Sequence, residues 1–471
     1  MINCPKCGEE LEDGATFCTN CGEKLTVSCP KCGKTLKPGV KFCSGCGTNL
    51  AEFSDEEEKP TVCPNCGAEL DEDATFCDQC GKSVKNLEDC PLQELLDLEH
   101  KTHGAEIRWR IGDCYLYGNG TGKDAAEAIK WFKKSAEQGN SDGQWKLGYC
   151  YYYGNGTEKD YTEAFKWYKK SAEQGNARGQ NNYGNCYCCG YGTKKNCIEA
   201  LRWYKKSAEQ GNYFGQYNLG ECYYCGQGVK KDYTEAFKWY KKSAEQGHDG
   251  AQYSLGWCYY YGNGTEKDCT EAFKWYKKSA EQGNATGQYY LGWCYCYGQG
   301  IEKDCTEAVK WFKKSAEQGH VGGQLRLGEC YCDGLGTEKD WEEAVKWFKK
   351  SAEQGNAEAQ YYLGRCYYDV DWEEAVKWFK KSAEQGNADG QCYLGKCYYA
   401  GIATVQDCEE AIKWFRKSAE QENADGQYNL GLCYYNGEGT EKDYEEAIKW
   451  AKKAAEQGHV GAKILLEEIP H

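Results

Sequence analysis

Proline is scarce in this sequence of 471 residues: there are seven prolines, six of them at or before Pro91 and the last at Pro470. Because proline breaks the interior of a helix, the long stretch between these two residues can be helical throughout. The sequence also lacks any window of about 18 apolar residues, which excludes a helix that spans a bilayer. We therefore expect a helical protein without a membrane span.

An excess of positive charge is absent as well. The sequence has 58 Lys and Arg residues against 73 Asp and Glu residues, and its formal net charge is −15. Phosphate backbones and anionic lipid surfaces attract positive charge. The balance argues against binding of the whole chain to nucleic acid or to an anionic membrane by general electrostatic attraction.

Cysteine, in contrast, is abundant, with 33 residues. The first residues, from Met1 to Cys4, have neither the basic nor the apolar region of a secretory signal. Without export, cysteines are reduced thiols or metal ligands rather than a disulfide framework. We expect a cytoplasmic protein.

Twelve of the cysteines follow one spacing, in which ten residues separate a CxxC pair from a second CxxC pair. Two such turns facing each other supply four thiolates in a tetrahedron, which suits structural zinc and leaves no open position for catalysis. The segments have few apolar side chains, so the metal supplies their folding free energy. We predict three zinc ions (Zn²⁺), held by Cys4, Cys7, Cys18 and Cys21, by Cys29, Cys32, Cys43 and Cys46, and by Cys63, Cys66, Cys77 and Cys80.

These segments resemble zinc ribbons, and the pair within residues 1–50 is similar to the double zinc ribbon. The resemblance implies interaction modules, some of which bind nucleic acid. Acidic residues flank the third segment, so a nucleic-acid role is restricted to the first two. The expected organisation is a first ribbon at 1–25, a second at 26–50, an acidic linker at 51–61, a third ribbon at 62–86, a connector helix at 87–104 and a repeat array at 105–471.

The repeat array is visible in the sequence SAEQG, which begins at Ser135 and returns every 36 residues, except for one step of 31 between Ser351 and Ser382. A fixed period of this length is typical of stacked supersecondary units. Each unit has the pattern of two helices. The second helix begins at an acidic cap such as Asp268, with Glu271 three residues later, and ends at a glycine such as Gly283.

Repetition decides whether the chemically suggestive residues belong to an active site. An aspartate, or once Asn196, with a glutamate three residues later occurs ten times at the start of the second helix, which identifies these residues as caps rather than as general acids and bases. The Gly-x-Gly motif, for example Gly298 and Gly300, also recurs, whereas a phosphate-binding loop occurs once after a strand. One cysteine of the first helix is present in all ten units, as expected for a small packing group. A metal site near Cys186 and Cys197 remains an alternative. We predict that the chain is not an enzyme.

With the whole unit in view, the array resembles the Sel-1-like repeat, a relative of the tetratricopeptide repeat. The matching residues of one unit are Leu255, Gly256, Tyr259, Gly262, Gly264, Asp268, Ala272, Trp275, Ala280, Gln282 and Gly283. The resemblance implies an all-α fold: a right-handed superhelical α-solenoid of about ten helix-pair repeats, here preceded by three small zinc ribbons. It also implies an adaptor or scaffold without catalysis.

Unit-to-unit variation indicates where a partner binds. Positions −5, −1, +2 and +6 from the leucine of the first helix vary, and this spacing places them on one stripe of that helix. The stripe includes several large aromatic residues, which mark interaction surfaces when they group together. Neutral variation on an exposed face is the alternative. The predicted partner-binding residues are Tyr149, Trp257, Tyr261, Tyr290, Trp293, Tyr297, Arg326 and Arg365.

Two functions from different classes are consistent with the sequence. The first is a non-catalytic scaffold that binds a protein or peptide in the concave groove of the solenoid. The alternative is a nucleic-acid-associated regulator that is tethered through its zinc ribbons.

Overall fold

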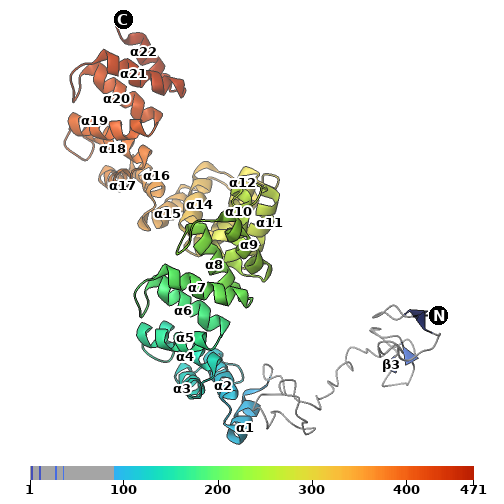
Figure 1. Cartoon of the computed structure of the whole chain (residues 1–471). Helices are drawn as coiled ribbons and strands as arrows, with labels where there is room; N and C mark the ends of the chain where they lie inside the picture. Colours follow the sequence, from blue (N-terminus) through green and yellow to red (C-terminus); the bar gives the residue numbers. More distant parts are fainter. Residues whose placement is uncertain (1, 4–9, 12–26, 29–34, 37–89, 471) are drawn as a thin grey trace. The chain divides into compact units, whose positions relative to one another are not determined.

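The computed structural model describes residues 2–3, 10–11, 27–28, 35–36 and 90–470. These residues contain four short strands and 22 α-helices (Figure 1). The helices are α1 (Leu92–Thr102), α2 (Ala105–Tyr117), α3 (Ala125–Glu137), α4 (Ser141–Tyr153), α5 (Tyr161–Glu173), α6 (Ala177–Cys189), α7 (Cys197–Glu209), α8 (Tyr213–Cys225), α9 (Tyr233–Glu245), α10 (Asp249–Tyr261), α11 (Cys269–Glu281), α12 (Ala285–Tyr297), α13 (Cys305–Glu317), α14 (Val321–Asp333), α15 (Trp341–Glu353), α16 (Ala357–Tyr367), α17 (Trp372–Glu384), α18 (Ala388–Ala400), α19 (Cys408–Glu420), α20 (Ala424–Asn436), α21 (Tyr444–Glu456) and α22 (Val460–Glu468).

The strands form two antiparallel pairs within the first two predicted ribbons. Strand β1 (Ile2–Asn3) pairs with β2 (Glu10–Leu11), with Ile2 opposite Leu11. Strand β3 (Val27–Ser28) pairs with β4 (Thr35–Leu36), with Val27 opposite Leu36. Each pair brackets the first CxxC motif of its predicted ribbon, and the cysteines themselves lie outside the described residues.

The chain divides into two compact units, Met1–Arg110 and Ile111–His471. The division falls inside α2, a few residues beyond the predicted start of the repeat array at residue 105. The second unit is a succession of helix pairs, in which each helix packs against the next. The predicted all-α solenoid of about ten helix pairs is therefore confirmed. None of the helices described is long and apolar enough to cross a membrane.

The second helix of each pair begins and ends as its sequence predicts. In α11 the Asp268 carboxylate accepts hydrogen bonds from the backbone N–H groups of Thr270 and Glu271, and the Glu271 carboxylate pairs with Lys274 at 2.6 Å. The helix is followed by Gly283, whose φ of +93° favours glycine. The aspartate is thus the cap, whereas the glutamate forms an ion pair along the helix and the Asp268 N–H donates to the Tyr259 carbonyl instead.

The hydrophobic core lies at the junctions between consecutive units. One cluster joins Ala272, Tyr276 and Ala280 of α11 to Leu291 and Cys294 of α12, which begins the next unit. The same combination recurs along the array, for example around Tyr240 of α9. A single helix pair cannot bury this surface by itself, so each unit depends on its neighbours.

A buried polar ladder runs beside this core. Gln252 of α10 donates a hydrogen bond to the Ala244 carbonyl of α9 and accepts one from the Gln282 side chain of α11, at 3.3 and 2.6 Å. Ser279 of α11 donates to the Asp249 carbonyl at 2.8 Å. Because buried polar groups without partners are costly, these glutamines and serines hold three consecutive helices in one register.

The shortened unit lies at α16 and α17. Helix α16 has 11 residues where the other first helices from α2 to α20 have 13. Four residues, 368–371, connect it to α17, where seven, such as 334–340, connect other pairs. The five missing residues therefore divide into two from the helix and three from the connection. The Tyr367 carbonyl closes the shorter turn by accepting from the N–H groups of Val370 and Asp371.

Candidate functional site

The first helices of the pairs line one side of the array. Several adjacent first helices touch directly, as α4 does with α6, α10 with α12 and α18 with α20. Within residues 111–470, no two adjacent second helices touch to a similar extent. Helices that approach each other more closely lie on the inside of a curved stack. The first helices therefore form the inner surface, where the sequence places the candidate partner-binding residues.

Five of the predicted residues come together in one aromatic cluster on α10 and α12. The ring of Trp257 lies 4.4 Å from that of Tyr261 and 5.4 Å from that of Tyr290, measured between centroids. Trp293 lies 4.8 Å from Tyr297. Tyr260, which contacts both Tyr261 and Trp293, joins the two groups. We call these six residues the aromatic cluster.

The members of the aromatic cluster differ in exposure. Tyr261 and Tyr297 are 53% and 50% exposed, whereas Trp257, Tyr290 and Trp293 are half-buried. Tyr290 also stacks on the buried ring of Tyr276 at 5.3 Å, so it belongs partly to the core. The two exposed tyrosines are the members that a partner can reach without rearrangement.

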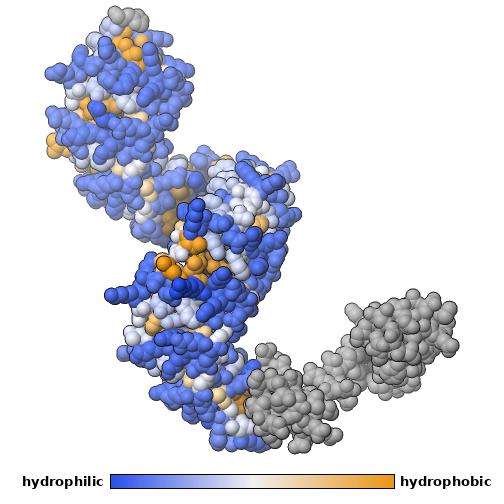
Figure 2. Space-filling view, in the orientation of Figure 1, coloured by the Kyte–Doolittle hydropathy of each residue, from blue (hydrophilic) through white to orange (hydrophobic). Residues whose placement is uncertain are grey.

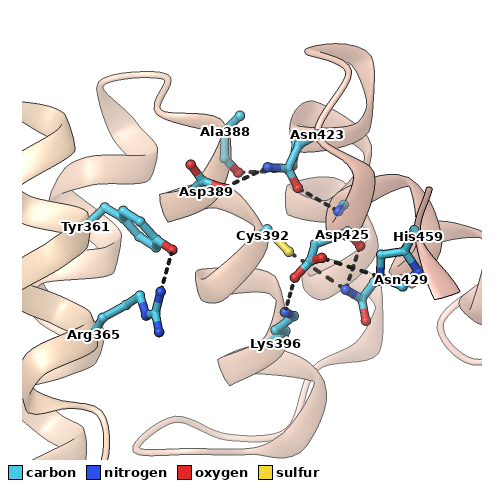
Figure 3. A network of polar contacts seen from close by, with 12 residues as sticks. Tyr361, Arg365, Ala388, Asp389, Cys392, Lys396, Asn423, Asp425, Asn429 and His459 are labelled. Atoms are coloured by element: carbon cyan, nitrogen blue, oxygen red, sulfur yellow. Dashed lines mark hydrogen bonds and ion pairs between the residues drawn. The ribbon is translucent and has the colours of Figure 1, made fainter. Parts of the chain in front are cut away.

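The other three predicted residues lie elsewhere. Tyr149 of α4 is half-buried between Trp145 and Tyr153, in a separate group. Arg326 of α14 is half-buried and pairs with the Glu329 carboxylate at 2.6 Å. Arg365 of α16 is exposed, and its guanidinium lies 3.5 Å from the Tyr361 hydroxyl (Figure 3). The structure therefore does not gather all eight residues at one place.

The stripe is also less open than its periodicity indicates. At position −1, Lys146 and Ser254 are buried, and Lys146 forms an ion pair with Asp113 at 2.7 Å. Towards the C-terminal end, Lys396 at position +2 pairs with Asp425, which also contacts His459 (Figure 3). Part of the variation between units therefore reflects contacts between neighbouring first helices.

A cavity of about 300 Å³ opens between α8 and α10, beside the aromatic cluster. Hydrophobic residues also reach the surface near α8, within a face that is mostly hydrophilic (Figure 2). The cavity is lined by Tyr217, Glu221, Tyr224, Cys225, Tyr240, Tyr253, Ser254 and Trp257. We call it the α8–α10 pocket.

Of the lining residues, the sequence singles out only Trp257 as a site residue. Tyr253 and Tyr224 stand at positions −2 and +5, which are aromatic in most units, so variation between units does not mark them. Glu221 stands at the variable position +2, but its place in a pocket depends on residues of neighbouring helices, which the sequence does not show. The Trp257 indole N–H donates to the Tyr224 hydroxyl at 2.8 Å and thereby joins α10 to α8.

The recurrent cysteines of the first helices are buried or half-buried thiols without disulfide partners. Burial raises the pKa of the Cys258 thiol to about 12, and the same holds for Cys294. These thiols are therefore uncharged packing groups at neutral pH. In the residues that the structure describes, no group of three or more His, Cys, Asp or Glu residues could hold a metal ion, and this includes the surroundings of Cys186 and Cys197.

All twelve cysteines of the three predicted zinc sites lie outside the described residues. Their donor set nevertheless fits the metal, since four thiolates in two CxxC pairs are a common ligand set of structural zinc. The sequence pattern thus implies zinc binding in the N-terminal segment.

The fold and its inner aromatic surface define a class, the α-solenoid repeat proteins. The family model of the Sel1 repeat matches residues 108–140, 141–176, 177–212, 214–248, 250–284, 285–320, 321–356, 357–369, 370–387, 388–423 and 424–459. The model of the double zinc ribbon matches residues 4–47 and 29–81. The chain belongs to the Sel1 repeat family and carries double zinc ribbon segments at its N-terminal end.

One solved structure agrees with this assignment, and a second match covers about half of the chain. The chain is 38% identical to c5321, a protective antigen of uropathogenic Escherichia coli with an SLR fold, over 81% of this chain and 82% of that one, with a TM-score of 0.66. It is 35% identical to a Sel1 repeat protein from Oxalobacter formigenes over 52% of this chain and 96% of that one, with a TM-score of 0.47. A comparison with curated proteins gives no match.

Proposed function

We propose that the chain is a non-catalytic scaffold that binds a protein or peptide partner on the inner surface of its central units. The carrying observation is the aromatic cluster of α10 and α12, next to the α8–α10 pocket. Aromatic side chains contribute most of the binding energy at interfaces when they group around a pocket. The repetition supports this role, because the capping carboxylates, the first-helix cysteine and the Gly-x-Gly motif recur in unit after unit as structural elements.

The N-terminal segment completes the proposal. We assign three structural zinc ions to the three sets of four cysteines, which form separate modules ahead of the scaffold. The unpaired thiols of the array suit a reducing compartment, so we place the protein in the cytoplasm.

The test uses the exposed tyrosines rather than the tryptophans, since removal of Trp257 would also break the contact between α8 and α10. Peptides are selected from a random display library against the full chain, and their dissociation constants are measured by fluorescence anisotropy. The double substitution Tyr261→Ala with Tyr297→Ala should weaken binding by about tenfold or more, because a central aromatic residue contributes about 1–2 kcal/mol or more.

The matched control is Trp341→Ala, which removes a 59% exposed aromatic residue from a second helix, α15. This variant should bind the same peptides as tightly as the unmodified chain, and both variants should keep their helical circular dichroism. Peptides that bind the double variant with unchanged affinity would contradict the proposal. The proposal would also be contradicted if no peptide could be selected.

A further inference from the structure

The α8–α10 pocket contains a carboxylate whose charge is not neutralised by the protein. Glu221 of α8 is half-buried, and its Oε1 accepts a hydrogen bond from the Tyr240 hydroxyl at 2.8 Å. Among residues 90–470, no lysine, arginine or histidine forms an ion pair with it. Burial, and to a smaller extent the charge of Glu221, raises the pKa of the Tyr217 hydroxyl. This hydroxyl therefore stays neutral beside the carboxylate. A partly desolvated negative charge of this kind favours a cation nearby.

Equivalent positions in other units show that this lack of a partner is specific to Glu221. Position +2 is also acidic at Asp113 and at Glu329. Asp113 pairs with Lys146 at 2.7 Å, and Glu329 pairs with Arg326 at 2.6 Å. Arg326 precedes Glu329 by three residues, and the corresponding residue in α8 is the uncharged Asn218. The Asn218 amide donates to Asn181 and Asn185 of α6 instead.

Most of the residues that line the pocket with Glu221 are aromatic. Tyr217, Tyr224, Tyr253 and Trp257 line the pocket together with this carboxylate. Their polar atoms are partly used within the protein, because the Tyr224 hydroxyl accepts from the Trp257 indole and from the Asn263 amide at 2.8 and 3.2 Å. The lining therefore offers a ligand several aromatic side chains and one carboxylate. The faces of aromatic rings attract cations, and several rings around one site hold alkylammonium groups.

We propose that the α8–α10 pocket binds an alkylammonium cation, the side chain of a lysine or methylated lysine that the partner protein inserts between α8 and α10. The assignment of this cation to a partner protein rests on the proposed function. The preference of the pocket for an ammonium group can be tested without a partner. The bound cation takes the place that Arg326 occupies beside Glu329 in α14.

The first experiment uses tetramethylammonium chloride with the full-length chain. The indole N–H signal of Trp257 is assigned by nuclear magnetic resonance with the Trp257→Phe variant and followed during the titration. Sodium chloride of equal ionic strength and the uncharged tert-butanol, which is of similar shape, are the reference titrants. Saturable shifts with tetramethylammonium alone are expected. Equal shifts with tert-butanol, or no shift, would overturn the proposal.

Three variants locate the effect. Glu221→Gln retains an acceptor for Tyr240 but removes the charge, and should weaken tetramethylammonium binding about tenfold. Glu329→Gln removes a carboxylate at the same repeat position that already has an internal cation, and should leave binding unchanged. Asn218→Arg places a guanidinium where α14 has one, and should abolish binding while the chain stays folded. Unchanged binding in both α8 variants would exclude this pocket.

A second experiment identifies the source of the cation. Capped lysine, capped trimethyl-lysine and capped Nε-acetyl-lysine are titrated in the same way. The two cationic forms should bind and the uncharged acetylated form should not. If tetramethylammonium binds through Glu221 but neither lysine derivative does, the assignment to a partner lysine is wrong. The scaffold role itself is judged separately, from the effect of the Tyr261 and Tyr297 substitutions.

Discussion

Single residues at the helix starts carry much of the regularity of the array. Seven of the ten first-helix starts from α4 to α22 are capped by asparagine, and the others by His248, His320 and His459. In α10 the Nδ1 atom of His248 accepts from the Ala251 N–H at 2.9 Å, and in α14 His320 accepts from Gly323 at 3.0 Å. A protonated Nδ1 cannot accept a hydrogen bond, so these caps require the neutral ring.

The histidine caps should make the array sensitive to pH. Burial lowers the pKa of His248 and of His320 below the ordinary value of 6.5. The unfolded chain therefore takes up protons before the folded chain does, and stability is lost as the pH falls from about 6.5 through the folded pKa values. Thermal unfolding is measured at about pH 7.5 and at about pH 5.5. Between these two values, the double variant His248→Asn with His320→Asn should lose less unfolding free energy than the unmodified chain, by about 1 kcal/mol per cap.

The matched reference for this prediction is the chain itself, since all other ionisable groups are common to both proteins. If the stability of the two proteins falls by the same amount over this pH range, the histidine caps do not couple stability to pH.

At the scale of the helix, the glycine of each LG pair decides how closely two helices approach. Gly292 of α12 lies against the ring of Phe312 of α13, and a Cβ atom added there would come within 2.8 Å of that ring and 3.2 Å of the Ala308 carbonyl. Phe312 is only 1% exposed and belongs to the core, so it has little room to move. The close contact of α12 with α13 therefore requires a residue without a side chain.

Substitution Gly292→Ala should destabilise the array although alanine is the better helix former. The gain in helix propensity is about 1 kcal/mol, whereas overpacking a core typically costs about 1–3 kcal/mol. We expect a net loss of about 1 kcal/mol or more in urea unfolding. Gly122→Ala is the control, since nothing lies within 4 Å of a Cβ at that position. A Gly292→Ala variant as stable as the Gly122→Ala variant would contradict this account of the helix contact.

At the scale of the whole molecule, two units with different sources of stability share one chain. The repeat array has a hydrophobic core at every junction between helix pairs. The N-terminal segment has twelve cysteines in zinc-ligand spacing and little apolar material, so we expect metal binding to supply its folding free energy. The two units should therefore respond independently to a chelator.

Metal analysis of the purified chain should give about three zinc ions per molecule. A strong chelator should remove them while the helical circular dichroism of the array and its thermal unfolding remain, and a thiol reductant should leave the array equally unaffected. A zinc content near zero would refute the assignment of the cysteine sets. Loss of helix on chelation or reduction would show that the array depends on metal or on disulfides.

Much of the fold could be predicted because its signals are local and repeated. The capping pair Asp268 and Glu271 and the terminating Gly283 mark a helix within one short segment, and ten copies establish the period. The recurrent cysteine could likewise be recognised as a packing group. The sequence could not show how the five missing residues divide between α16 and the connection to α17, because this depends on the hydrogen bonds that close the turn.

The candidate site could be predicted only in part. Helical periodicity identifies the side of a helix on which a residue lies, which is why Trp257, Tyr261, Tyr290, Trp293 and Tyr297 were found together. It does not show how closely the next first helix approaches. For that reason Lys146 is buried where helical periodicity predicts an open surface, and Tyr149 lies in a separate group.

By itself the sequence determined the helix pairs and their caps, because each depends on residues within one or two turns of each other, and the number of units, because the same pattern repeats along the chain. Only the tertiary structure decided that α8 and α10 enclose a pocket, and that Glu221 has no cation where Glu329 has Arg326. These properties arise between units, from the direction in which Asn218 turns and from the distance between two stacked helices. No local pattern encodes that distance, because it is set by the packing of all the side chains between the helices.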